Sequence, residues 1–126
     1  MGQEYLIDTN TVIDYLDNKL PDKINNLIDN INSKISVITR MELLAWPGAT
    51  THQTAILEEF IDSSFVYPLD EPVILKAIEI RKFNKLKLPD AIIAATALIN
   101  NFTLITRNEK DFSNIEGFNL LNPHKV

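Results

Sequence analysis

With 126 residues, of which 45% are hydrophobic and 23% charged, the chain has the size and balance of one globular domain spanning residues 1–126. It contains no cysteine, which excludes disulfides, thiolate metal sites and cysteine nucleophiles. A net charge of −5 argues against a simple electrostatic nucleic-acid binder, although an enzyme that holds cations is compatible with it. The sequence has neither a secretion-signal pattern nor an apolar run as long as a membrane span, so we expect a cytoplasmic protein.

Short apolar runs and amphipathic stretches alternate through the first half of the chain. The predicted elements are a strand over 5–7, a helix carrying Val12, Ile13 and Leu16, a helix over 24–31, a strand over 35–38, a helix opened by a capping box of Thr39 and Glu42 and stopped at Pro47-Gly48, and a helix over 51–62. This half of the chain therefore reads as two successive units of a strand followed by helices.

The second half continues the alternation. Its predicted elements are a strand over 65–67, a helix opened by Pro72 with a basic polar face, a nearly all-apolar helix over 91–99 that follows Pro89-Asp90, a strand over 102–105, a helical turn over 108–112 and a last strand over 118–121. Alternating strands and helices predict an α/β fold, in which a mostly parallel central sheet of about four or five strands is flanked by helices in three layers.

Acidic side chains follow several of the predicted strands. Asp8 comes directly after the first, Glu42 follows the second, Asp111 follows the fourth, and Asp90 opens the apolar helix. Each acid also suits a helix N-terminus, where carboxylates cap backbone N–H groups and favour the dipole. Parallel strands end at one sheet edge, however, and carboxylates gathered there repel one another unless a cation lies among them. Hard oxygen ligands without cysteine suit Mg²⁺ or Mn²⁺.

Four blocks make the pattern specific: residues 7–13, 36–43, 88–97 and 104–112. In this order they resemble the blocks of PIN-domain ribonucleases, most closely VapC-type toxins of bacterial toxin-antitoxin pairs. The resemblance covers essentially the whole chain. It implies a PIN-like fold and a metal-dependent endoribonuclease that hydrolyses RNA phosphodiester bonds with Mg²⁺ or Mn²⁺. It also implies a cognate antitoxin protein as partner and pairing of the enzyme as a homodimer.

The resemblance also implies roles for single residues. Asp8, Glu42, Asp90 and Asp111 match the acidic quartet that holds the metal and is catalytic, and Thr9, Asn10 and Thr106 match polar positions that orient the ligands. Asn108 stands where some relatives have an acid, and Glu109 is close by, so the fourth acid is Asp111 or one of its neighbours.

Several residues outside the quartet have two readings each. Lys82, Lys85 and Lys87 either guide RNA phosphates or form a solvated helix face. Arg40 and Arg107 either contact substrate or pair with the neighbouring acids. Trp46 is expected to anchor a helix end or an interface, and His52 and His124 are expected to be surface residues because they lie outside every block.

Two other functions compete with the ribonuclease. A haloacid-dehalogenase-like phosphatase is favoured by Asp8-Thr9-Asn10-Thr11-Val12, but Asn10 replaces the second acid, which is the proton donor in that chemistry. A non-catalytic PIN module that binds RNA would need no acidic quartet, and all four acids are present.

Overall fold

The computed structural model describes residues 3–126, and its strands are all parallel to their neighbours. The strands are β1 (Tyr5–Ile7), β2 (Lys34–Ser36), β3 (Phe65–Tyr67), β4 (Thr103–Ile105) and β5 (Leu120–Leu121). One ladder has the order β1-β4-β5 and the other pairs β2 with β3. Because β1 also contacts β2, the two ladders adjoin, and the predicted parallel sheet is built from these two parts.

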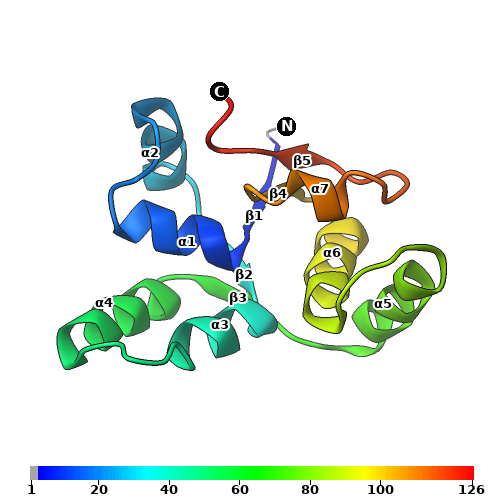
Figure 1. Cartoon of the computed structure of the whole chain (residues 1–126), viewed down its shortest axis with the longest axis horizontal. Coiled ribbons are helices and arrows are strands. Elements are labelled where there is room, and N and C mark those ends of the chain that lie inside the picture. Colours follow the sequence, from blue (N-terminus) through cyan, green and yellow to red (C-terminus); the bar gives the residue numbers. More distant parts are fainter. Residues whose placement is uncertain (1–2) are drawn as a thin grey trace.

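Helices cover both faces of the strands (Figure 1). They are α1 (Thr9–Leu16), α2 (Asp22–Asp29), α3 (Val37–Leu44), α4 (Thr51–Asp62), α5 (Glu71–Phe83), α6 (Leu88–Asn100) and α7 (Glu109–Phe112). Figure 1 shows α1 to α4 on one side of the strands and α5 and α6 on the other. Of the helices formed by residues 3–126, none has the length and apolar character needed to cross a membrane.

The alternation of side chains along the strands creates two cores. Leu6 of β1 and Leu104 of β4 point to the side of α5 and α6 and pack in the first core. Ile7 and Ile105, the next residues along, pack in the second core with apolar residues of α1 to α4. This arrangement of helices, strands and helices confirms the three-layer α/β fold.

Helix α6 lies at the centre of the first core, as its sequence predicts. Residues 91–97 are all buried, which a helix with a single apolar stripe would not allow. Pro89 lies in its first turn, where the missing N–H costs nothing, and Asn101 ends it with a positive φ of 57°. The helix that opens with Leu88 thereby holds Asp90 in its first turn.

Several predicted boundaries were wrong, among them those of the helix predicted over 24–31, which is observed as Asp22–Asp29. The strand predicted over 35–38 ends at Ser36, whose side chain accepts a hydrogen bond from Ile38 N at 3.0 Å and caps α3. The helix therefore begins at Val37, and Thr39 is a buried residue inside it, not the first member of a capping box with Glu42. At the end of the chain, the strand predicted over 118–121 is reduced to Leu120–Leu121.

Candidate active site at the carboxyl ends of the parallel strands

Asp8 lies at the point where β1 passes into α1. Its backbone N–H donates to Ile105 O at 3.0 Å, which extends the ladder between β1 and β4 by one bond. Its Oδ1 accepts from Thr9 N at 2.8 Å, and its Oδ2 accepts from Thr106 Oγ1 at 2.7 Å and from Asn10 Nδ2 at 3.2 Å. The carboxylate is thus held by groups from the ends of two neighbouring strands.

The environment of Asp8 disfavours its charge. The residue is only 5% exposed, and burial, with smaller contributions from the neighbouring carboxylates of Asp90 and Glu42, raises its pKa from 3.8 to about 6. Hydrogen bonds from Thr106 and Thr9 oppose this rise. None of the ion pairs between residues 3–126 involves Asp8. A buried carboxylate without a cationic partner is an unusual feature that marks a candidate functional site.

Glu42 reaches the same place from α3. Its Oε1 accepts a hydrogen bond from Thr9 Oγ1 at 2.6 Å. The hydroxyl oxygen of Thr9 also lies 3.1 Å from that of Thr39, which is buried in the first turns of α3. Thr9 therefore links the start of α1 to α3 and holds the exposed carboxylate of Glu42 near Asp8.

Asp90 and Asp111 complete the acidic edge. Burial, followed by the carboxylates of Asp111 and Glu42, raises the pKa of half-buried Asp90, and Lys87 opposes the rise. Asp111 is exposed on α7, where its Oδ2 accepts from Asn108 Nδ2 at 3.0 Å. Asn108 therefore holds an acid of the predicted quartet, while its side chain makes no capping hydrogen bond to α7. The fold brings the predicted acids within electrostatic range of one another.

The donor chemistry of this edge fits a hard divalent cation. The side chains of this edge offer carboxylate, hydroxyl and amide oxygens and no thiolate, and the acids raise rather than lower one another's pKa values. Within residues 3–126, however, no three histidine, cysteine, aspartate or glutamate side chains are already grouped to hold a metal ion. The residues provide suitable ligands, and their side chains would have to draw together around a cation.

Arg107 pairs with an acid outside the predicted quartet. Its Nη1 lies 3.1 and 3.3 Å from the two carboxylate oxygens of Asp14, on α1. His124 is exposed, as predicted, and its Nε2 also lies 3.0 Å from Asp14 Oδ2, so this surface histidine is a partner of a buried acid. Sequence reasoning missed Asp14, since no local pattern links it to partners 93 and 110 positions away.

The remaining predicted cations are exposed. Lys82 lies in the last turn of α5, Lys85 follows that helix, and Lys87 precedes α6. Lys87 is close enough to Asp90 to oppose the rise of its pKa. Arg40 is exposed on α3, two residues before Glu42, and takes part in no ion pair between residues 3–126.

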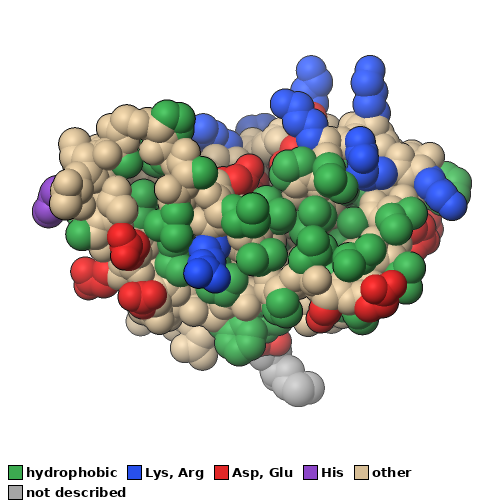
Figure 2. Space-filling model, turned by 90° about the horizontal axis from the view of Figure 1, so that it is seen from below, with side chains coloured by type: hydrophobic (Ala, Val, Ile, Leu, Met, Phe, Trp, Pro, Cys, Tyr) green, Lys and Arg blue, Asp and Glu red, His purple; other side chains and the backbone are tan. Residues whose placement is uncertain are grey.

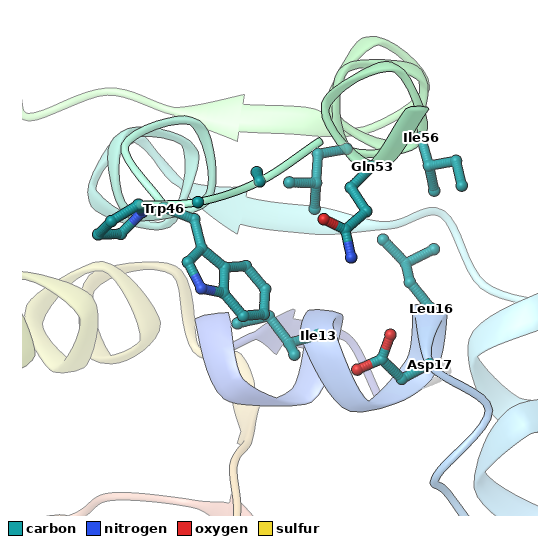
Figure 3. Close-up of a pocket in the computed structure, with 10 residues that line it drawn as sticks. Ile13, Leu16, Asp17, Trp46, Gln53 and Ile56 are labelled. Carbon is teal, nitrogen blue, oxygen red and sulfur yellow. The ribbon is translucent and has the colours of Figure 1, made fainter. Parts of the chain in front are cut away.

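An apolar groove lies between α1 and α4, beside the end of α3. Its lining includes Ile13 and Leu16 of α1, Trp46 after α3, and Gln53 and Ile56 of α4. Figure 3 shows the Trp46 ring close above Ile13, with Gln53 and Ile56 on the opposite wall. Trp46 is 44% exposed, so a large aromatic surface remains open to solvent at this end of the groove.

A second apolar surface covers the face that holds α3 and α5. Figure 2 shows hydrophobic side chains gathered across the middle of this face, with most of the visible lysines and arginines along one border. The exposed large apolar residues of α3, α5 and α6 include Met41 and Leu44 of α3, Leu75, Ile78 and Phe83 of α5, and Leu88 at the start of α6. Exposed apolar residues gathered in this way are typical of protein–protein interfaces.

The chain is similar to proteins of known family and known structure. A family model described as PIN domain matches residues 5–117. Ribonuclease VapC1 of Methanocaldococcus jannaschii is 30% identical over 121 residues, which cover 91% of this chain and 83% of that protein.

Two solved structures extend the comparison to three dimensions. A toxin-antitoxin complex from Klebsiella pneumoniae contains a chain that is 30% identical, with a TM-score of 0.79 and coverage of 98% of this chain and 100% of that chain. DNA-bound VapBC from Salmonella typhimurium contains a chain that is 26% identical, with a TM-score of 0.81 and coverage of 95% and 98%.

Proposed function

The chain belongs to the PIN-domain family, and from this premise we propose that it is a metal-dependent endoribonuclease, the toxin of a type II toxin-antitoxin pair. Its relatives include a protein named as a ribonuclease and chains of toxin-antitoxin complexes. The observation on which the proposal depends is the acidic edge, where buried Asp8 forms no ion pair with any of residues 3–126 and lies within electrostatic range of Asp90 and Glu42. The match to the PIN-domain model favours the ribonuclease over the phosphatase alternative.

In this proposal, Asp8, Glu42, Asp90 and Asp111 hold Mg²⁺ or Mn²⁺. When bound, such an ion supplies a more acidic water molecule and neutralises the charge that develops on the phosphoryl oxygens. Thr106 and Asn10 fix the Oδ2 atom of Asp8 by hydrogen bonds of 2.7 and 3.2 Å.

The other supporting groups fix the remaining acids. Thr9 holds Glu42 Oε1 at 2.6 Å and Asn108 holds Asp111 Oδ2 at 3.0 Å. Preformed hydrogen bonds of this kind reduce the freedom that each carboxylate loses when it binds a cation. Lys82, Lys85, Lys87 and Arg40 are exposed, Lys87 acts on Asp90, and in this proposal their positive charge would attract RNA phosphates.

The experiment that tests this function is cleavage of a mixed RNA pool in Mg²⁺ or Mn²⁺, with EDTA as the metal-free arm. Wild-type protein is compared with Asp8→Asn and with Glu58→Gln, which removes an exposed charge from α4. We expect cleavage by wild type and Glu58→Gln only, and none in EDTA. Cleavage by folded Asp8→Asn would contradict the site assignment, and binding of RNA without cleavage by wild type would identify a non-catalytic PIN module.

The groove of Ile13, Leu16, Trp46 and Ile56 is the proposed contact for a helix of the antitoxin. An arginine or lysine of the same partner would enter the space among the acids, because a guanidinium pairs well with carboxylates and competes with metal. The structures of toxin-antitoxin complexes support the existence of such a partner. Copurification followed by Mn²⁺ titration tests this: binding should weaken as Mn²⁺ rises, and indifference to Mn²⁺ would place the inhibitor elsewhere.

The apolar surface over α3 and α5 supports the proposed homodimer. Leu75 and Ile78 are 58% and 51% exposed on adjacent turns of α5. Burying them against a second copy would remove apolar area from water. Light scattering should report a dimer that Leu75→Glu/Ile78→Glu converts to a monomer, whereas a monomeric wild type would contradict the pairing.

A further inference from the structure

We propose that Asp14 is a positioning residue, which anchors Arg107 and thereby fixes the segment that presents Thr106 and Asp111 to the acidic edge. The inference deepens the proposed ribonuclease function and rests on it. Asp14 lies on α1, outside the acidic quartet, and it is 4% exposed. Its carboxylate faces Arg107, the residue directly after Thr106, and not the acids themselves.

The contact between Asp14 and Arg107 is a strong one. Arg107 Nη1 lies within 3.3 Å of both carboxylate oxygens of Asp14. A charged hydrogen bond to a buried carboxylate is stronger than a neutral one, and its loss would leave that carboxylate poorly compensated. The Arg107 side chain is 56% exposed, but its charged end is held to α1. Arg107 thus has a structural partner that restrains the backbone around it.

A short chain of hydrogen bonds leads from Arg107 to Asp8. The backbone N–H of Arg107 donates to Asn10 Oδ1 at 3.3 Å. The Nδ2 atom of the same Asn10 amide donates to Asp8 Oδ2 at 3.2 Å and to Thr106 Oγ1 at 3.3 Å. Displacement of Arg107 would therefore change the orientation of Asn10, and through it two of the groups that hold Asp8.

The same segment leads on to Asp111. Asn108 N donates to Thr106 Oγ1 at 3.1 Å, and Asn108 Nδ2 donates to Asp111 Oδ2 at 3.0 Å. Arg107, which is bound to Asp14, therefore lies in the same short segment as Thr106, which contacts Asp8, and Asn108, which contacts Asp111. Small displacements of groups around reacting atoms reduce the rate much more than they reduce substrate affinity.

His124 provides a matched control. It contacts Asp14 Oδ2 at 3.0 Å and belongs to the C-terminal tail, which reaches α7 through the bond of Lys125 to Glu109 at 2.9 Å and not through His124. His124→Ala removes one partner of the buried carboxylate and leaves the bond to Arg107 in place. This variant therefore removes one contact to Asp14 while Arg107 stays bound to it.

The first arm of the test is amide hydrogen exchange measured by NMR on the metal-free protein. Asp14→Asn and Arg107→Gln should each speed exchange of the Arg107 and Asn108 amides by roughly five- to tenfold, because the segment opens more often. His124→Ala should leave these amides unchanged. Equal exchange in wild type, Asp14→Asn and Arg107→Gln would overturn the proposal, and this result is independent of whether the protein cleaves RNA.

The second arm is steady-state cleavage of one RNA substrate in Mn²⁺. Asp14→Asn and Arg107→Gln should each lower kcat by about tenfold or more with KM unchanged, and the double variant should lose no more than either single one. If Arg107 instead contacts RNA directly, Arg107→Gln raises KM while Asp14→Asn does not. That result, or an unchanged kcat in folded Asp14→Asn, would overturn the positioning role. An inactive wild type would reject the proposed ribonuclease. In that case the exchange measurement alone tests whether Asp14 holds the Arg107 segment.

Discussion

Two buried carboxylates of the same short helix have opposite surroundings. Asp8 caps the N-terminus of α1 and is 5% exposed, and Asp14 lies in the body of that helix and is 4% exposed. Asp14 is paired with Arg107 and His124. Asp8 receives hydrogen bonds from uncharged groups and has Asp90 and Glu42 as its charged neighbours. Burial is therefore the same in both places, and only the compensation of charge differs.

This difference separates a structural carboxylate from a candidate catalytic one. A buried charge is tolerated when a partner of opposite sign neutralises it, as Arg107 does for Asp14. Where the protein buries an acid beside other acids without such a partner, ionisation of that acid destabilises the folded state, which is the direction of the raised pKa of Asp8. A cation that binds among the acids would neutralise their charge. Asp8, and not Asp14, is therefore the buried acid that we expect to bind metal and to be catalytic.

The largest effect should come from Asp90, whose role also has a purely structural explanation. Asp90→Asn should reduce RNA cleavage to background, because it removes a proposed metal ligand. Asp22→Asn is the matched control, since Asp22 is the acid in the first turn of α2, as Asp90 is in α6. Both variants lose a favourable interaction with a helix dipole, but only Asp90→Asn should lose activity in an RNA cleavage assay. Equal cleavage by Asp90→Asn and Asp22→Asn would show that Asp90 only stabilises the N-terminus of its helix.

The next effect is one of stability, and its sign differs between the two buried acids. The folded-state pKa of Asp8 is about 6, above the ordinary value of 3.8. The folded protein therefore binds this proton more tightly, and ionisation of Asp8 destabilises it as the pH rises from about 4 to 6. Asp8→Asn removes this loss, which has an upper limit on the order of 2–3 kcal/mol, and should raise the melting temperature at pH 7.

The corresponding change at Asp14 should act in the opposite direction. Asp14→Asn weakens the bonds to Arg107 and His124 and should lower the free energy of unfolding at pH 7 by roughly 1–2 kcal/mol, since Arg107 is partly solvated. Thermal melts of both variants at pH 4 and pH 7 check the pair. The gain from Asp8→Asn should shrink at pH 4, where Asp8 is protonated in the wild type. If the melting temperatures of both variants shift in the same direction at pH 7, the proposed difference between Asp8 and Asp14 is wrong.

The smallest effect concerns the lysines near the acidic edge. Replacement of Lys82, Lys85 and Lys87 by glutamine should weaken RNA binding and reduce the slope of log affinity against log salt by at most about 2. The control removes Lys19 and Lys23, which are exposed beside α2, and the two slopes are compared per charge removed. The affinities are measured by fluorescence anisotropy with a labelled RNA. Equal changes of slope per charge for the two sets of lysines would mean that Lys82, Lys85 and Lys87 only form a solvated helix surface.

Much of the fold follows from local patterns. The helix predicted over 51–62 is observed as Thr51–Asp62, because Thr50 and Gln53 form a reciprocal capping box at its start. The nearly all-apolar composition of 91–99 predicted the central position of α6, and the gathering of acids follows from the common edge of parallel strands.

Other features depend on distant contacts that local patterns do not contain. Ser36 and Thr39 are both suited to cap a helix, and the local sequence does not choose between them. In the folded chain, Thr39 is buried against Thr9 of α1, and Ser36 makes the cap. The bonds of Asp14 to Arg107 and His124 are of the same kind, since they join helix α1 to the last part of the chain. The side-chain spacing of the acidic edge also depends on how α3, α6 and α7 pack.

The central claim is that the acids around Asp8 form a cation site, and titration calorimetry with Mn²⁺ tests it most directly. Wild-type protein and Asp14→Asn should bind Mn²⁺ at pH 7, while Asp8→Asn should show little or no binding heat. Binding to the wild type should weaken below pH 6, where protons compete for Asp8 with its pKa of about 6. Equal binding of Mn²⁺ by wild type and folded Asp8→Asn would contradict the account.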